Sequence, residues 1–334
     1  MNISASSKRL PRWAVLLLAL GLSLGITVNL MSAQTLIWLE DRLPTFATVF
    51  LSLFIEAAPF LLLGTLASGL VEVFVDRGEL TRWLPRDPVR AVLTGCVLGL
   101  IFPVCECGVV PLTRRLYSKG LPVPAGVAFI LAAPVLNPIV IASTLTAFGP
   151  SKVFWGRLGL TLLVAFAVGL IFCVHPHPEQ LLRTAPAEPV EPFRRPPLRE
   201  GLQRVAQIAA DEFFEMGRYL VIGGMLAALL QTLVPQAALL NLGRGPVLSV
   251  ALLLGLALLL SVCSTVDAFI ALTFASSFTT GSLLAFLVFG PMIDIKSTLM
   301  LLGLFRKRPV VYLVLLPLMM VAVIAVFLNL NTVW

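Results

Sequence analysis

Two thiols flank a carboxylate in an apolar segment of this 334-residue chain. The stretch at 102–111 reads FPVCECGVVP and contains Cys105, Glu106 and Cys107. Thiolates bind soft, thiophilic centres, so this spacing favours a binding site for such a species. The alternative is that the cysteines are small apolar fillers, which is the usual role of a lone buried cysteine.

Residues that disrupt helices surround this motif. Pro103 lacks the N–H that a helix requires, Gly108 permits a backbone that a helix would not adopt, and Pro111 closes the segment. Irregular backbone at membrane depth is tolerated only where protein or a water-filled cavity satisfies it. We therefore predict a helix break that faces a cavity, with Cys105, Glu106 and Cys107 as substrate-binding residues.

A second broken segment reads SVCSTVD at 261–267. It keeps one thiol, Cys263, and adds the hydroxyls of Ser264 and Thr265, so we expect these three side chains to bind substrate. An ionisable side chain at membrane depth is costly, which makes Asp267 a candidate for coupling or gating. The alternative is a carboxylate that neighbouring hydroxyls satisfy.

The segment AAPVLNP at 132–138 places two prolines and an amide in the middle of an apolar run. Pro134, like Pro291 in the second half, disrupts helical hydrogen bonding and frees carbonyl groups that can coordinate a cation or substrate, and Pro138 is a further helix-break residue. Asn137 is the polar side chain at this break, and we predict that it also binds substrate.

The corresponding segment of the second half reads GPMIDIK at 290–296. Pro291 predicts another helix break. Asp294 and Lys296 lie two residues apart, so on a regular helix they would not face each other. We expect each to pair elsewhere, Lys296 with Asp267, and predict a coupling or gating role, with a purely structural ion pair as the alternative.

One further acid lies deep in an apolar run. Glu56 is a candidate to carry a proton in exchange for substrate. Its counterpart 159 residues later, Glu215, stands beside Asp211, Glu212 and Arg218, which favours an interfacial position instead.

The composition excludes a water-soluble domain. Of all residues, 58% are hydrophobic and 12% charged, whereas a soluble domain is about one quarter charged. Most of the chain must face hydrocarbon, with room for about seven to nine spans of about 20 residues. The apolar segments are 13–38, 46–75, 89–113, 121–149, 152–174, 213–234, 246–278, 281–304 and 309–330.

Charge and cysteine content narrow the function further. The net charge of +7 does not indicate a nucleic-acid partner, because the basic residues form short clusters between apolar runs. Five cysteines, all in apolar runs, exclude a secreted disulfide framework. No CxxC, phosphate-binding loop, GxSxG or HExxH motif occurs, so we expect no enzyme, no metal and no cofactor. Transport would then depend on an ion gradient or on a partner.

The chain contains an internal repeat. Three matches occur in order and at a nearly constant offset, and such repeats with broken apolar segments are typical of secondary transporters. The matches pair 54–56 with 213–215, 104–105 with 262–263, and 128–129 with 285–286, at offsets of 159, 158 and 157. We divide the chain into an N-terminal span and loop (1–44), a first repeat (45–174), a Pro- and Arg-rich cytoplasmic linker (175–205) and a second repeat (206–334). The apolar run at 13–30 is taken as a first span, with a cleaved signal peptide as the alternative.

Basic residues also predict the topology. If 89–113 and 246–278 enter and leave the membrane on the same side, most basic clusters lie inside, as the positive-inside rule requires. The N-terminus and the linker are then cytoplasmic, and the two Glu-bearing spans run in opposite directions, which makes the repeats inverted. The basic residues left outside are Arg42, Lys152, Arg157 and Arg244.

The motif PVCECGVVPL at 103–112 resembles the signature of the YraQ-like predicted permeases, a family that includes the ArsP-type efflux permeases for trivalent organoarsenicals. The segments at 119–122, 132–138 and 290–296 are similar to that family as well. The resemblance covers about residues 45–330 and implies a multi-pass permease of the bacterial cytoplasmic membrane, without implying arsenic for this member. It carries a thiol role over to Cys105 and Cys107, which occupy the matching motif.

These patterns predict an all-α polytopic membrane protein with broken or re-entrant helices in two inverted repeats. The bilayer and a small-molecule or metalloid substrate are its expected partners, and homo-oligomerisation stays open. We expect ion-gradient-driven efflux of a thiophilic solute, such as a trivalent arsenical, that exchanges on and off the thiols. The alternatives are a permease for another small anion or metabolite, with incidental thiols, and a membrane-embedded redox or channel subunit of a larger complex.

Overall fold

The computed structural model describes residues 33–85, 87–175, 178–183, 196–233, 245–275 and 277–331. The described secondary structure is helical except for one isolated bridge between Leu182 and Phe305. The chain divides into two compact units, residues 1–48 and 49–334, and every candidate site residue belongs to the second. The predicted first span and its signal-peptide alternative fall largely on residues 1–32, outside the described part.

Apart from the short helices at 77–83 and 178–181, the described helices follow one another in the same order in the two halves. The first half contains α2 (Ala33–Phe74), α3 (Arg77–Trp83), α4 (Pro88–Ile101), α5 (Glu106–Ser118), α6 (Val123–Leu136), α7 (Pro138–Phe148) and α8 (Lys152–Cys173). The second contains the short 3-10 helix η1 (Pro178–Leu181) and then α9 (Leu198–Leu233), α11 (Leu248–Leu260), α12 (Asp267–Phe274), α13 (Thr280–Met292), α14 (Ile295–Leu304) and α15 (Lys307–Asn331). Helix α9 begins at Leu198, inside the range 175–205 that was expected to be linker. Pro197 is the last proline before Pro235, so no proline interrupts the helix between Leu198 and Leu233.

Six described ranges are long and apolar enough to cross a membrane: Arg42–Phe74, Val123–Phe148, Lys152–Cys173, Leu198–Leu233, Thr280–Leu304 and Lys307–Asn331. Helices α4 and α11 are apolar but have only 14 and 13 residues. At 1.5 Å per residue each is about 20 Å long, too short to cross a core of about 30 Å alone. This arrangement confirms an all-α polytopic membrane protein with interrupted spans.

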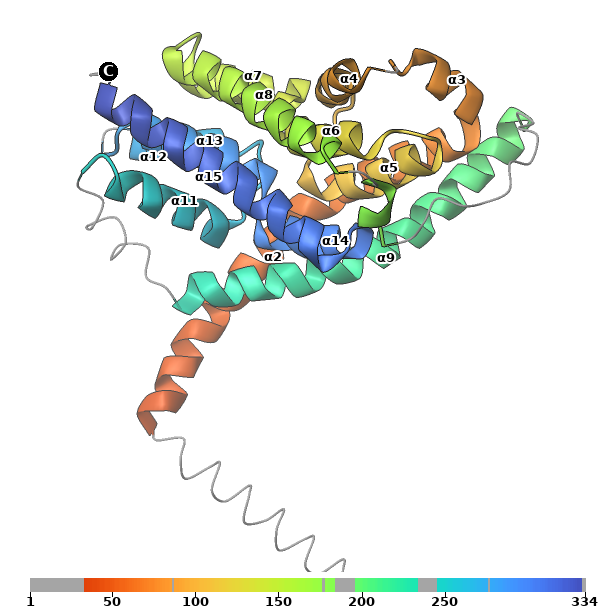
Figure 1. The fold of residues 1–334 in the computed structure, drawn as a ribbon. Coiled ribbons are helices and arrows are strands. Elements are labelled where there is room, and N and C mark those ends of the chain that lie inside the picture. Colours follow the sequence, from red (N-terminus) through yellow and green to blue (C-terminus); the bar gives the residue numbers. More distant parts are fainter. Residues whose placement is uncertain are drawn as a thin grey trace, which may run out of the picture. The chain divides into compact units, whose positions relative to one another are not determined.

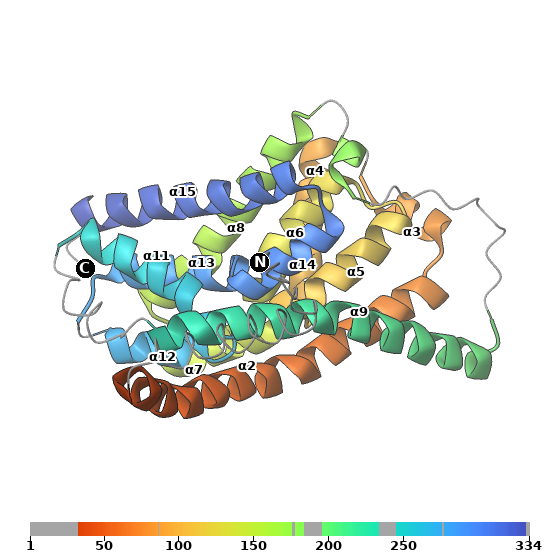
Figure 2. The same ribbon diagram turned by 90° about the horizontal axis from the view of Figure 1, so that it is seen from below.

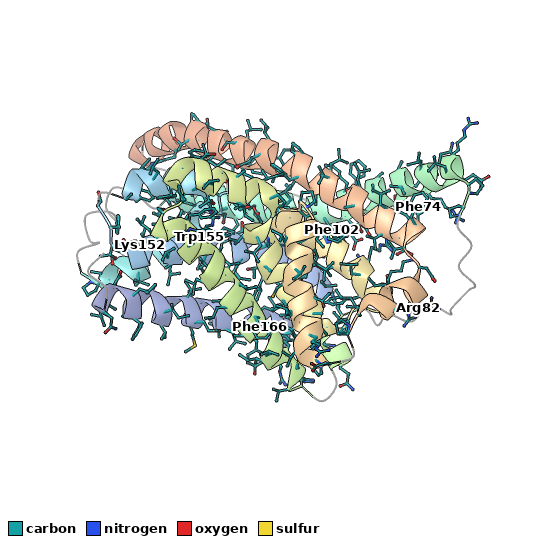
Figure 3. The ribbon with its side chains drawn as sticks, turned by 90° about the horizontal axis from the view of Figure 1, so that it is seen from above. Phe74, Arg82, Phe102, Lys152, Trp155 and Phe166 are labelled. Atoms are coloured by element: carbon teal, nitrogen blue, oxygen red, sulfur yellow. The ribbon has the colours of Figure 1, made fainter. Side chains whose placement is uncertain are left out.

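The outer helices present apolar side chains to their surroundings. Ile55 on α2 is 68% exposed, Trp155 on α8 64%, Phe214 on α9 77% and Val323 on α15 66%. Figure 3 shows such side chains along the outer face of α8, where Trp155 and Phe166 are labelled. In water this surface would be strongly unfavourable, whereas in hydrocarbon it costs nothing.

Helices α6 and α13 form the centre of the second unit, and almost all of their residues are buried. Helix α6 packs against α4 and α8, while α13 packs against α11 and α15, and the two central helices contact each other. Figure 1 shows α8 beside α15, and Figure 2 shows α9 running alongside α14 and α5. Phe102, at the end of α4, packs edge-to-face on Phe129 of α6 with ring centroids 6.1 Å apart (Figure 3).

Two of the interrupted spans break at a residue that caps the following helix. Asn137 has extended backbone, and its Oδ1 accepts hydrogen bonds from the backbone N–H groups of Ile139 (2.8 Å) and Val140 (3.1 Å) at the start of α7. Asp294, 157 residues later, has extended backbone too, and forms a reciprocal capping box with Ser297 of α14. Such caps satisfy N–H groups that would otherwise be unpaired.

The other two breaks leave several residues outside any helix. Between α4 and α5 the chain is non-helical from Phe102 to Cys105, and Cys105 is the extended N-cap of α5. After α11, Ser261 adopts a left-handed conformation with φ of 45°, and α12 begins only at Asp267. Both breaks therefore fall where the prolines and polar residues predicted them.

Two residues assigned to the first break lie inside α5 instead. Pro111 is followed by further helix to Ser118, so it does not close the segment. Gly108 has a different role from the one predicted: a Cβ at Gly64 of α2 would collide with the Gly108 backbone, so the glycine pair permits a close helix crossing. Pro134 and Pro291 stand in the last turns of α6 and α13, just before their breaks.

Candidate substrate site at the helix breaks

Three thiols from the two halves meet in the buried centre. Cys105, Cys107 and Cys263 are each at most 2% exposed, and all are free thiols. The thiol of Cys105 is close enough to both other thiols to interact with them electrostatically. The structure therefore brings together the cysteines that the sequence proposed as partners, on the turn before α5 and the turn after α11.

Beside these thiols lies a buried cluster of charge. The Lys296 Nζ donates a hydrogen bond to the carbonyl of Ser261 (2.7 Å) and lies 3.4 Å from Asp294 Oδ2 and 4.0 Å from Glu106 Oε1. The expectation that Lys296 pairs with Asp267 was wrong. Asp294 and Lys296 do meet, because Asp294 stands on extended backbone before α14, where helical spacing does not apply.

Asn137 connects the two breaks of the first half. While its Oδ1 caps α7, its Nδ2 donates a hydrogen bond to the carbonyl of Val104 (3.3 Å), which belongs to the break before α5. In the second half, Lys296 makes the corresponding connection to the carbonyl of Ser261. Both carbonyls belong to non-helical residues that have lost a helical partner, so each needs a donor from elsewhere.

Asp267 pairs with a residue that the sequence analysis assigned to the outside. The Arg157 Nη2 lies 2.7 Å from Asp267 Oδ2, and its Nη1 donates to the Thr144 hydroxyl (2.8 Å). Arg157 is fully buried in α8 rather than in an external loop. The missed signal was a lone arginine within an apolar run, which requires a buried partner.

The remaining predicted residues surround this centre. Ser264 is fully buried and Thr265 is partly buried, both in the turn that follows Cys263. Glu56 of α2 is partly buried and within electrostatic range of Lys296. Pro138 is the first residue of α7, where its missing N–H costs nothing.

Several buried polar atoms at the site have no hydrogen-bond partner among the described residues. A buried polar atom without a partner is rare in native proteins and marks a place that a ligand or ion can satisfy. These atoms are Glu56 Oε1, both carboxylate oxygens of Glu106, Arg157 Nε, Ser264 Oγ, Asp267 Oδ1 and Asp294 Oδ2.

The site is closed in this conformation. The void next to Glu106, lined also by Pro134, Met292 and Ser297, is too small to admit a water molecule. The three thiols are at most 2% exposed, so a solute could reach them only if the surrounding helices moved apart.

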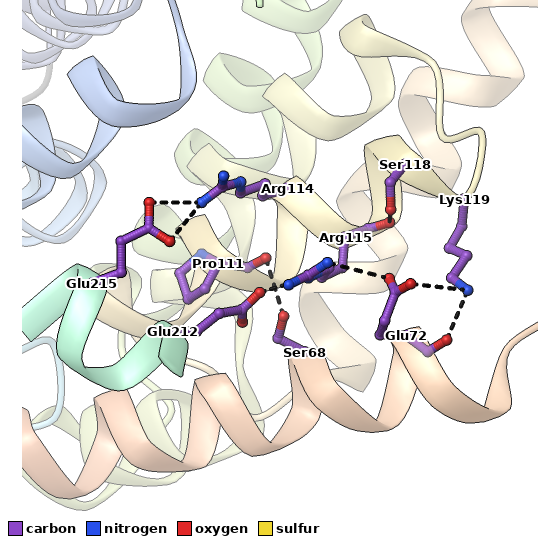
Figure 4. Close-up of polar contacts among 9 residues, drawn as sticks. All are labelled: Ser68, Glu72, Pro111, Arg114, Arg115, Ser118, Lys119, Glu212 and Glu215. Carbon is purple, nitrogen blue, oxygen red and sulfur yellow. Dashed lines mark hydrogen bonds and ion pairs between the residues drawn. The ribbon is translucent and has the colours of Figure 1, made fainter. Parts of the chain in front are cut away.

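A second polar cluster holds the far end of α5 (Figure 4). Its basic side chains were expected in a loop after 113, but α5 continues through them and they pair with acids of α2 and α9. The pairs are Arg114–Glu215 (2.9 Å), Arg115–Glu212 (2.6 Å) and Lys119–Glu72 (3.6 Å). The helix that carries Glu106 and Cys107 is therefore held at its other end by ion pairs, and Glu215 belongs to this cluster rather than to the thiol site.

Interrupted apolar helices around a buried polar centre define the class: an all-α, polytopic membrane protein of the permease type. Residues 42–330 match a family described as "Predicted permease", and the chain belongs to this ArsP-type family. The match spans both halves and all four helix breaks.

Two relatives support the assignment. The UPF0718 protein YcgR of Bacillus subtilis is 47% identical over 270 residues, covering 80% of this chain and 91% of the relative. A Streptococcus mutans protein, named as a presumed subunit of a two-component membrane permease complex, is 36% identical over 266 residues, covering 78% and 87%. No solved structure matches the chain.

Proposed function

We propose that this permease carries a thiophilic solute, such as a trivalent organoarsenical, out of the cell through the site formed by Cys105, Cys107 and Cys263. One observation carries the proposal: thiols from both halves of the chain converge at a closed, buried site. Soft thiolate ligands select soft centres over hard metal ions.

The chemistry of trivalent arsenic suits such a group of thiols. Each thiol that bonds arsenic displaces one hydroxyl group, which leaves as water together with the thiol proton, so no net charge is created. An organic substituent occupies one arsenic valence, which leaves two for sulfur. The third thiol can then replace either of the first two, and this exchange keeps the cargo from being trapped.

The charged residues supply candidates for coupling to an ion gradient. Glu56 and Asp267 each have one buried carboxylate oxygen that forms no hydrogen bond within the described part of the chain. Asp294 and Lys296 stand at the break between α13 and α14, where motion of the two helices would change their contacts. In this scheme Ser264, Thr265 and Asn137 complete the polar lining around the cargo.

Resistance of a growing culture tests the thiol site directly. An arsenic-sensitive bacterium that expresses the chain should tolerate methylarsenite better than cells without it, with arsenite and antimonite as comparison cargoes. Cys105→Ser, Cys107→Ser and Cys263→Ser should each return tolerance to the level of cells without the protein. Cys96→Ser is the matched control, because Cys96 is equally buried but outside the thiol group, and it should keep the tolerance.

If cells with and without the protein are equally sensitive to all three compounds, the proposal that the cargo is a trivalent arsenical would be wrong. Transport that survives alkylation of Cys105 and Cys107 would favour the permease for a small anion or metabolite. In either case the permease class would stand, because it rests on the family and the fold.

The name of the Streptococcus relative favours a second candidate, a subunit of a larger membrane complex. This role is compatible with transport if a partner supplies energy. Stoichiometric co-purification of another protein from the native membrane would support it, and a monodisperse assembly of this chain alone would favour a monomer or homo-oligomer.

We also propose that the two halves are inverted repeats in the bacterial cytoplasmic membrane. The same order of helices and breaks in both halves supports a repeat, and the basic clusters place the linker inside. Single cysteines introduced by Ser118→Cys and Thr184→Cys should both be labelled only from the cytoplasmic side. Labelling from opposite sides would contradict this topology.

A further inference from the structure

The ammonium group of Lys296 lies among oxygen atoms from three broken segments. The Ser261 carbonyl comes from the turn after α11, Asp294 Oδ2 from the break before α14, and Glu106 Oε1 from the first turn of α5. Lys296, Glu106 and Asp294 are at most 2% exposed. Backbone carbonyls at unwound helix breaks are ligands that transporters use for coupling cations, and the two carboxylates supply the negative charge here.

The ammonium is the charge that offsets these acids. Both oxygens of Glu106 and the Oδ2 of Asp294 have no hydrogen-bond partner among the described residues. Within the described part of the chain, no other cation forms an ion pair with either acid. Arg157, the other fully buried cation of the centre, is held by Asp267 instead.

Other titratable groups face this cluster as well. Glu56 from α2 lies within electrostatic range of Lys296, as do the thiols of Cys107 and Cys263. None of these groups brings positive charge. Removal of the ammonium would therefore leave buried carboxylates without a counter-charge, which is strongly unfavourable at membrane depth.

The first half provides a comparison, because the position that corresponds to Lys296 has no carboxylate beside it there. Ile139 is the residue 157 positions before Lys296, and it has no charge. There the neutral amide of Asn137 donates to the carbonyl of Val104 in the preceding break. At this break position only the second half has a cation, and there Asp294 and Glu106, the latter from the first half, lie within 4.0 Å of it.

We propose that Glu106, Asp294 and the Ser261 carbonyl form a monovalent-cation site that the chain fills with its own Lys296. The permease then holds its centre together without bound Na⁺ or K⁺. This inference goes beyond the proposed cargo and holds whatever solute is carried.

Thermal unfolding of the purified protein tests the proposal without any cargo. Wild type, Lys296→Ala and the exposed control Lys307→Ala would be compared in NaCl, KCl, methylammonium chloride and choline chloride at one ionic strength. Lys296→Ala should unfold several degrees higher in methylammonium or Na⁺ than in choline, because a small cation replaces the missing ammonium. Wild type and Lys307→Ala should not distinguish the salts. A Lys296→Ala protein with one Tm in all four salts would overturn the proposal.

A second variant covers the case in which Lys296→Ala does not fold. The triple variant Lys296→Ala/Glu106→Gln/Asp294→Asn removes both carboxylates along with the ammonium, so it should be recovered in folded form. If the triple variant also fails to fold, the lysine is needed for its packing rather than its charge, and the cation site is excluded. Because Tm needs no cargo, a failed resistance assay and a failed cation assay remain distinguishable.

Discussion

Replacement of Arg157 by methionine should destabilise the protein by about 3–5 kcal/mol. The substitution keeps an unbranched side chain of similar length but leaves Asp267, which is 2% exposed, as a buried charge without its partner. It also removes the hydrogen bond to the Thr144 hydroxyl. Unfolding of the purified protein in mixed detergent micelles would measure the loss.

The double variant Arg157→Met/Asp267→Asn gives the decisive comparison. It removes both charges, so it should recover most of the stability that Arg157→Met loses, since the cost lies in the uncompensated carboxylate. Lys152→Met, at the exposed start of the same helix, should change stability little. A single variant as stable as wild type would mean that Asp267 does not depend on Arg157.

This pair matters because of the elements that it joins. Arg157 belongs to α8, Thr144 to α7 and Asp267 to the first turn of α12, four residues after Cys263. The ion pair therefore fixes the thiol-bearing turn of the second half against the last helices of the first. We expect Arg157→Met to reduce transport even in the fraction that remains folded.

Alanine at Gly64 should destabilise the protein by about 3 kcal/mol, at the upper end of the usual cost of overpacking. The added Cβ would collide with backbone atoms of Gly108, which cannot move without shifting α5 against α2. Gly108 lies three residues after Cys105, so the shift would also displace the thiols. The same unfolding assay, together with the resistance assay, would detect both effects.

Gly217 provides the matched control on α9. A Cβ there would meet nothing within 4 Å, so Gly217→Ala should raise stability by about 0.5–1 kcal/mol through helix propensity alone. Changes in stability of opposite sign for Gly64→Ala and Gly217→Ala would distinguish the effect of close helix packing from that of helix propensity. Equal effects at Gly64 and Gly217 would show that α2 and α5 do not cross as closely as described.

In both halves a side chain donates a hydrogen bond to a carbonyl of a non-helical turn, but the donor groups differ. Each has a non-helical turn whose carbonyl needs a donor, and each takes that donor from the neighbouring interrupted span. The first half uses the amide of Asn137, and the second uses the ammonium of Lys296.

The ion pairs at the far end of α5 suggest how the closed state is held. Arg114, Arg115 and Lys119 connect α5 to α9 and α2. The Arg114–Glu215 pair is partly exposed and contributes little alone, whereas Arg115 pairs with the buried Glu212. Together they fix the orientation of the helix whose first turn carries Glu106 and Cys107.

Much of this architecture could be predicted from the sequence. Hydrophobicity and length determine that the chain spans a membrane, because hydrocarbon accepts only helices whose backbone is internally bonded. Pro103, Asn137 and Asp294 mark helix breaks through local rules, since a missing N–H and a capping side chain act within a few residues. The placement of polar residues at these breaks also predicted that Cys105, Cys107 and Cys263 would share one site.

Contacts between distant segments were decided only by the tertiary structure. Lys296 was expected to pair with Asp267, but Arg157 holds Asp267, and Lys296 meets Glu106 and Asp294 instead. Spacing along a helix says nothing about which helix packs opposite, and a buried charge takes whichever partner the fold places nearest. Gly108 could not be recognised as a packing residue for the same reason: the sequence does not indicate that Gly64 lies opposite it. The sequence thus determined which side chains are unusual in a membrane, and the packing of the two halves decided which of them touch.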